Sequence, residues 1–130
     1  LLSRRQRQMC IRDSYKNTLA DVIVNGKKIH TIRRRFISPG TILKHIVYPY
    51  QRDKRKCLLS NVCVSCQSIK VVTSECVNEC RIYVDGRPIN DMNVLHEIAW
   101  NDGFVNLLSF FLFFSEPFEG YIIHWTDKKY

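Results

Sequence analysis

The sequence lacks an apolar run long enough to cross a membrane. Its longest run, residues 107–114, is interrupted by Ser109 and falls far short of the roughly 20 residues that a membrane-spanning helix needs. No secretory signal, internal repeat, low-complexity tract or interdomain linker is visible either. These absences favour a single soluble domain in the cytoplasm without a membrane partner, and we expect a monomer.

The first part of the chain differs in character from the rest. Residues 4–13 read like the conceptual translation of an adaptor used in DNA sequencing libraries, and residues 1–3 fit a translated index. We therefore interpret residues 1–14 as a non-native, disordered segment and residues 15–130 as the domain; the alternative is a genuine basic arm. The segment holds four arginines and one aspartate, so without it the net charge falls from +8 to +5.

The first half of the domain combines one helix signal with several strand signals. Leu19, Val22 and Ile23 stand at helical spacing, which predicts a short amphipathic helix over residues 15–25 that ends at Asn25–Gly26. β-branched residues favour strands over 30–33, 41–48, 62–73 and 80–84. Turn residues at 38–40 and 85–86 separate some of these strands.

After Pro88 the apolar spacing changes from two to about 3.6 residues. Asp91 can cap a helix with one apolar face, and Asn101–Asp102–Gly103 can end it. A second apolar stripe follows over residues 104–114, which we interpret as core packing, and residues 121–125 are expected to form a last strand. The pattern as a whole predicts an α+β domain.

A set of motifs, taken in order, resembles the ASCH domain, and in particular the small stand-alone versions common in bacteriophages and bacterial mobile elements. The motifs are GKKIHTIR at 26–33, PG at 39–40, LxxIAxxDGF at 95–104, FFxxF at 110–114 and GYIIHW at 120–125. The resemblance implies a PUA-like fold: a compact β-barrel of about five or six strands with one early and two late helices outside it. Such relatives commonly bind RNA or modified bases.

One branch of that family is similar to small bacterial amidohydrolases that remove the acetyl group from N4-acetylcytidine. By this resemblance Lys28 and Thr31 fall on the catalytic lysine and threonine, and Asp102 on the catalytic acid, which is a glutamate in those enzymes. A lysine desolvated in a cleft can take the proton of a threonine hydroxyl, and a carboxylate can orient that lysine. His30 departs from the enzyme branch, which tends to have a small residue there.

Two basic clusters suggest a nucleic-acid partner. Cationic side chains neutralise phosphates, and exposed tyrosines stack on unpaired bases. The candidate contacts in the first cluster are Lys27, Lys28, Arg33, Arg34 and Arg35. Those in the second are Tyr50, Arg52, Lys54, Arg55 and Lys56. The alternative reading of the second cluster is a charged loop that is simply solvated.

The cysteines allow a zinc site by number, but their arrangement favours free thiols unless the strand breaks into a knuckle. Cys63 and Cys66 form one pair and Cys76 and Cys80 another, as a tetrahedral site requires. The first pair lies in an apparently continuous strand, where side chains three positions apart point to opposite faces. We therefore expect free thiols, with neither a metal ion nor a cofactor.

Three functions remain open from the sequence. The first is a module that binds RNA, another single-stranded nucleic acid or a modified nucleoside. The second is an amidohydrolase acting through Lys28, Thr31 and Asp102. The third is a protein interaction module that uses the aromatic stripe, if the fold does not cover it. Catalysis requires the three residues to converge in one cleft, binding requires a continuous positive surface, and protein interaction predicts exposed phenylalanines.

Overall fold

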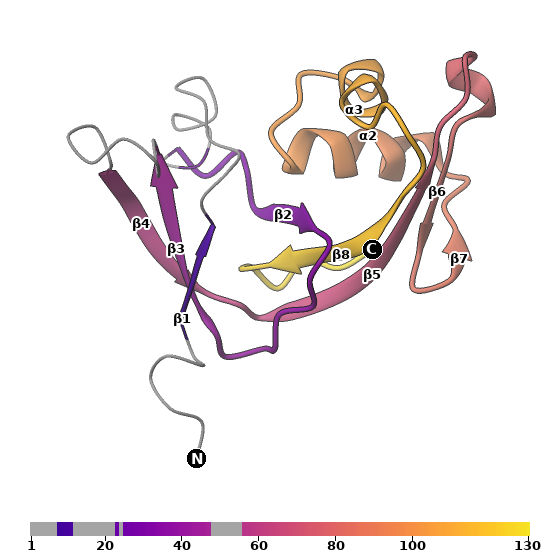
Figure 1. Cartoon of the computed structure of the whole chain (residues 1–130). Coiled ribbons are helices and arrows are strands. Elements are labelled where there is room, and N and C mark those ends of the chain that lie inside the picture. Colours follow the sequence, from indigo (N-terminus) through magenta and orange to yellow (C-terminus); the bar gives the residue numbers. More distant parts are fainter. Residues whose placement is uncertain (1–7, 12–22, 24, 48–55) are drawn as a thin grey trace.

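The computed structural model describes residues 8–11, 23, 25–47 and 56–130. In this part of the chain, two β-sheets meet at a bend and two helices cover one face of the larger sheet (Figure 1). The elements are β1 (Gln8–Ile11), β2 (His30–Arg33), β3 (Ile42–Val47), β4 (Lys56–Val62), β5 (Ser65–Val72), the short 3-10 helix η2 (Val77–Glu79), β6 (Arg81–Val84), β7 (Arg87–Pro88), α2 (Met92–Asn101), α3 (Leu107–Phe113) and β8 (Phe118–His124).

The smaller sheet has the order β1-β3-β4. Strands β3 and β4 are antiparallel, with a register shift between His45 and Ile46, and β1 runs parallel to β3. Strand β1 falls within the segment 1–14 for which we expected disorder; the rest of that segment lies outside the described residues. Without β1 this edge of β3 would be open, and an open edge can pair with any extended chain, a foreign segment included.

The larger sheet has the order β2-β8-β5-β6-β7, and all its neighbouring strands are antiparallel. The central strand β5 pairs with β8 on one side and with β6 on the other. In this sheet β2, which is the second half of the motif at 26–33, lies beside the last strand, β8. His30 lies opposite His124. Segments from the two ends of the domain therefore build one surface.

A break in backbone pairing joins the two sheets. The sequence favours one continuous strand over 62–73, but β4 ends at Val62 and β5 begins at Ser65. At the break, the Cys63 N–H donates to the Thr41 carbonyl and the Val64 N–H donates to the His124 carbonyl, each at 2.8 Å. The partner strand thus changes from β3 to β8 here. The expectation of a continuous strand was wrong, because two different sheets compete for the same segment.

The first late helix begins and ends where the sequence predicts, and the second, α3, lies within the predicted apolar stripe over residues 104–114. The Asp91 carboxylate accepts a hydrogen bond of 2.9 Å from the Asn93 N–H and so caps α2. Gly103, with φ of 97°, follows the helix in the left-handed conformation that glycine tolerates. Asn106 caps α3 in the same way, with its side chain accepting from the Ser109 N–H at 2.8 Å.

The main core lies between these helices and the inner face of the larger sheet. Ile98 and Phe110 from the helices are fully buried in it with Val71, Ile82 and Ile122 from the sheet. The interpretation of the aromatic stripe as core is confirmed for Phe110, Phe111 and Phe114. A second buried cluster fills the bend between the sheets: Ile23, Ile37, Leu43, Cys63 and Ile123.

The fold is mixed α+β, as the sequence predicts, and both late helices are present. The early helix falls mostly outside the described residues; Ile23 is helical, and Gly26 follows it with φ of 82°. The strands that the structure describes form two sheets that do not close into a barrel. No helix among the described residues is both long and apolar enough to span a membrane.

Candidate functional site

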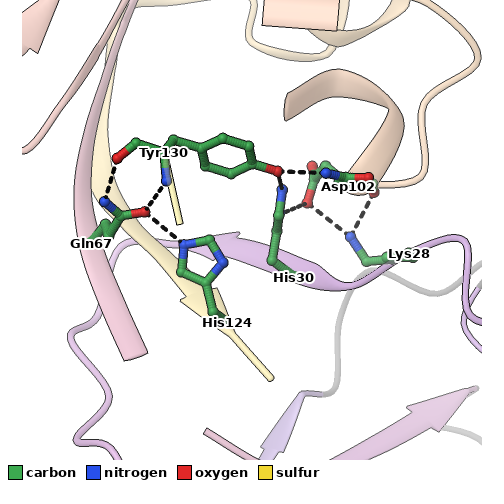
Figure 2. A network of polar contacts seen from close by, with 7 residues as sticks. Lys28, His30, Gln67, Asp102, His124 and Tyr130 are labelled. Atoms are coloured by element: carbon green, nitrogen blue, oxygen red, sulfur yellow. Dashed lines mark hydrogen bonds and ion pairs between the residues drawn. The ribbon is translucent and has the colours of Figure 1, made fainter. Parts of the chain in front are cut away.

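Lys28 and Asp102 form a buried ion pair between the segment before β2 and the end of α2 (Figure 2). The Lys28 Nζ donates to the Asp102 backbone carbonyl at 2.6 Å and to Oδ1 at 2.9 Å. The two residues are only 4% and 7% exposed. A backbone hydrogen bond of 2.9 Å from the Ile29 N–H to the Asn101 carbonyl fixes the two segments against each other. The lysine is therefore held as an internal partner of the helix end.

Burial and pairing act on the two charges in different ways. Burial alone would raise the pKa of Asp102, but attraction to Lys28 and contact with His30 outweigh it, and the pKa falls below its usual range. Burial lowers the pKa of Lys28, and the carboxylate opposes that effect. The carboxylate is thus favoured in its ionised form, as a buried counter-ion to the lysine.

His30 connects this ion pair to Tyr130. Its Nδ1 lies 3.3 Å from the Asp102 Oδ1, without hydrogen-bond geometry, and its Nε2 lies 2.9 Å from the Tyr130 hydroxyl. A carboxylate beside Nδ1 favours a proton on that nitrogen, so Nε2 accepts from the tyrosine. The Tyr130 oxygen then accepts from the Asn101 amide at 2.8 Å. Burial raises the pKa of Tyr130, so its hydroxyl stays neutral.

His124 belongs to a second part of the same network. The Gln67 amide nitrogen donates to Asp85 and to the Tyr130 carbonyl, which makes its Oε1 the acceptor for the Tyr130 N–H and for the His124 Nε2. His124 therefore carries its proton on Nε2. Burial lowers its pKa to about 4. The network thus joins two imidazole rings and a tyrosine to one buried ion pair, while the Nδ1 atoms of His30 and His124 have no hydrogen-bond partner in it.

Thr31 lies on the other face of β2. Side chains alternate along a strand, and His30 shares one face with its partner His124. Thr31 therefore shares the opposite face with its partner Ile123, which belongs to the second buried cluster. Among the described residues, no hydrogen bond joins Thr31 to Lys28 or Asp102. The structure thus brings together two of the three residues proposed for catalysis, but not the third.

An exposed groove lies on the outer face of the larger sheet, opposite the helices. Its volume is ≈ 670 Å³. The groove is lined by outward-facing side chains of β5, β6 and β8 and by one residue that follows β2. These are Ser68, Lys70, Tyr83, Glu119, Tyr121 and Arg34. The alternation of β5 explains this face, because Ile69 and Val71 point into the core while Ser68 and Lys70 point out.

The first basic cluster divides between the buried network and this face. Arg34 lines the groove and lies over the Phe118 ring, 5.3 Å from its centroid, and Arg35 is exposed. Arg33 is half-buried and lies opposite Tyr121 in the sheet. Lys27 stacks over Trp100, 3.6 Å from the ring centroid. Lys28, in contrast, cannot reach a surface phosphate in this conformation because it is buried.

The second basic cluster falls almost entirely outside the described residues. This applies to Tyr50, Arg52, Lys54 and Arg55. Lys56 begins β4, and only its backbone is described. These residues remain predictions.

Sequence reasoning missed the residues that build the groove floor. Tyr83 stands between the buried Ile82 and Val84, and Tyr121 stands beside the buried Ile122. That alternation was a readable signal for two outward-facing tyrosines. What the sequence did not show is that the helices cover only the inner face, which leaves the outer one open.

Four cysteines, Cys63, Cys66, Cys76 and Cys80, are free thiols. Cys63 is buried, and its Sγ lies 3.5 Å from the Ser65 carbonyl. Burial raises the pKa of Cys63 to about 11. In the part of the chain that the structure describes, no group of three or more histidine, cysteine or acidic residues is arranged to hold a metal ion.

Part of the aromatic stripe is exposed. On and just before α3, Val105, Leu108, Leu112 and Phe113 all face solvent, with Phe113 66% exposed. Phe36, on the side of the groove, is 55% exposed and makes an edge contact with Tyr121, with ring centroids 5.5 Å apart. Exposed phenylalanines are thus present on two different surfaces.

Comparisons of this chain with protein-family models, curated proteins and solved structures find no match.

Proposed function

We propose that this protein is a binding module for single-stranded nucleic acid, most directly RNA, and that it binds through the outer face of the larger sheet. The observation that carries the proposal is the groove itself, in which Tyr83 and Tyr121 lie among Arg34 and Lys70 on an open sheet face. Proteins that bind single strands combine these two elements, aromatic rings for the bases and cations for the backbone.

Single strands fit this face better than duplexes do. Tyr83 and Tyr121 are half-buried in the sheet, so each is held in place while part of its ring stays open. Stacking on such rings needs unpaired bases, because the bases of a duplex already stack on each other. Phe36 contacts Tyr121 edge-on and extends the same aromatic surface.

The charge of the chain supports the same partner. Residues 15–130 carry a formal net charge of +5. Arg34 and Arg35 are exposed directly after β2, and Arg34 lines the groove. A positive surface raises the local concentration of a polyanion and speeds its association. On this proposal, the resemblance to the ASCH domain and its PUA-like fold reflects a shared role in binding RNA or modified bases.

The geometry favours binding over hydrolysis. An amidohydrolase of the proposed kind needs Thr31 beside Lys28. In this structure Thr31 faces the second buried cluster with Ile123, whereas Lys28 pairs with Asp102 on the side of β2 that His30 faces. Lys28 also donates two hydrogen bonds to Asp102, which keeps it from acting as a free base.

A second candidate function rests on the exposed side of α3. Leu108, Leu112 and Phe113 form an apolar surface there, as a protein interaction module would require. Binding of RNA and binding of a protein at α3 use opposite sides of the larger sheet, so one set of variants separates them.

The test is fluorescence anisotropy with a labelled single-stranded RNA of about ten nucleotides, a length within the range that one such surface covers. Tyr83→Ala and Tyr121→Ala should each weaken binding by about 1–3 kcal/mol through lost stacking. Arg34→Ala should lower the slope of log K against log salt by about 0.7, one phosphate contact. Phe113→Ala, on the helix side, is the matched control and should bind normally. No binding of the unaltered protein at low salt contradicts the proposal.

A further inference from the structure

We infer that the groove recognises guanine, through the edge of the base that pairs in a duplex, with Lys70 and Glu119 as the reading residues. The inference rests on the proposed function. It comes from a feature that RNA binding alone does not explain, namely a carboxylate among the lining residues of a surface that otherwise attracts phosphates.

Lys70 and Glu119 are direct neighbours across β5 and β8. The Lys70 Nζ lies 3.6 Å from a Glu119 carboxylate oxygen, within ion-pair range but beyond hydrogen-bond length. Their side chains are 53% and 76% exposed. Both polar groups are therefore available to a ligand, one as a donor and one as an acceptor, side by side.

A phosphate is a poor ligand for this pair, because Glu119 repels it. A base edge is a better one, since a base presents donors and acceptors next to each other without net charge. The backbone phosphates are then expected at Arg34, which also lines the groove, and the bases over the pair.

Among the four bases, guanine matches the pair best. Its N1–H and N2–H groups are adjacent donors that can both reach one carboxylate, and its O6, next to them, accepts from an ammonium group. Cytosine and adenine each offer one exocyclic amine to the carboxylate, and uracil offers only its N3–H. Guanine is thus the base that uses both oxygens of Glu119 and the charge of Lys70 together.

The two tyrosines lie near the pair, where each can stack on a base of the bound RNA. Tyr83 lies directly opposite Lys70 on β6, and Tyr121 is two residues along β8 from Glu119. By ordinary sheet spacing these positions are about 5 Å and about 7 Å from the pair. A base over the pair, or its immediate neighbour in the strand, therefore reaches a tyrosine ring.

The first arm of the test uses the unaltered full chain and labelled oligouridylates that differ only at one central position. An RNA with a central guanine should bind about tenfold more tightly than those with adenine, cytosine or uracil, as a good base contact provides. Inosine, which lacks the N2 amino group, should lose about half of that factor on a logarithmic scale. Equal binding of all five RNAs overturns the inference and leaves the proposed function intact, whereas no binding of any of them contradicts both.

The second arm uses variants at exposed positions. Glu119→Gln should abolish the preference for guanine and bind oligouridylate at least as well as the unaltered protein, because a repulsive charge is gone. Glu116→Gln, a change at an exposed glutamate that does not line the groove, should keep the preference. A guanine preference that survives Glu119→Gln overturns the assignment to this pair, which then is an ordinary surface ion pair of small effect.

Discussion

The Nζ of Lys28 lies 2.9 Å from the Oδ1 of Asp102, and both side chains are buried although 74 positions separate them in the sequence. Neither the segment before β2 nor the end of α2 would bury a charged side chain without the opposite charge on the other. The end of α2 and the segment before β2 therefore depend on each other.

Removing one member of this pair should destabilise the fold strongly. Asp102→Ala leaves the Lys28 ammonium buried without its carboxylate, and a broken buried pair costs about 3–5 kcal/mol. The double variant Lys28→Met with Asp102→Leu should cost much less, because no charge is left uncompensated. Urea denaturation of the single and double variants measures both values. A loss below about 1 kcal/mol for Asp102→Ala would be the behaviour of a solvated surface pair, and would contradict the burial described above.

Stability should fall when the pH is lowered from 6.5 towards 4. His45 and His124 are fully buried, and burial lowers the pKa of each from 6.5 to about 4. In that window the unfolded chain takes up protons that the folded protein does not. The contribution of the two histidines to the free energy of unfolding is therefore fully present above pH 6.5. Below that pH it declines by about 1.4 kcal/mol per pH unit for each histidine.

Urea denaturation at several pH values checks this pH dependence. His124→Gln should reduce the slope between pH 6.5 and 4, whereas His96→Gln, at an exposed position, should leave it unchanged. A stability that stays flat over the window would show that the two rings take up protons freely in the folded protein.

Gly120 should not tolerate a side chain. A Cβ at this position would collide with the backbone carbonyl of Arg33 on β2 and come within 2.7 Å of the Phe118 ring. Gly120→Ala should therefore push β2 and β8 apart and lower stability by about 1–3 kcal/mol. Glu119→Ala, one position earlier and exposed, should change stability by less than about 0.5 kcal/mol. Thermal unfolding of the two variants compares them, and equal melting temperatures would contradict the close approach of the strands.

The sequence predicts the elements of this fold better than it predicts their neighbours. Asp91 and Gly103 are local signals that mark the ends of α2, and the apolar spacing after them predicts that a second helix follows. The bend at Cys63 is different, because nothing local marks the point where a strand leaves one sheet for another. Its cause is the competition between β3 and β8 for the backbone of one segment.

The site shows the same limit. A lysine that precedes a strand without an acid nearby looks solvated, so the basic cluster alone predicts Lys28 on a charged surface. The carboxylate that pairs with it comes from the end of α2, far along the chain. The resemblance to the ASCH domain selected Asp102, whereas residue spacing did not. Tyr83 and Tyr121 were readable as outward-facing residues, but the pairing of Lys70 with Glu119 depends on strand register, which only the structure shows.

The most direct test of the proposed function is to map bound RNA on the protein by NMR. Backbone amide shifts of the 15.4 kDa protein are followed while a short single-stranded RNA with one guanine is added. Binding through the outer sheet face predicts that the shifts concentrate on β5, β6 and β8 around Lys70, Tyr83 and Tyr121, and that α3 stays unchanged. Shifts confined to α3, or to the residues around Lys28, would contradict it.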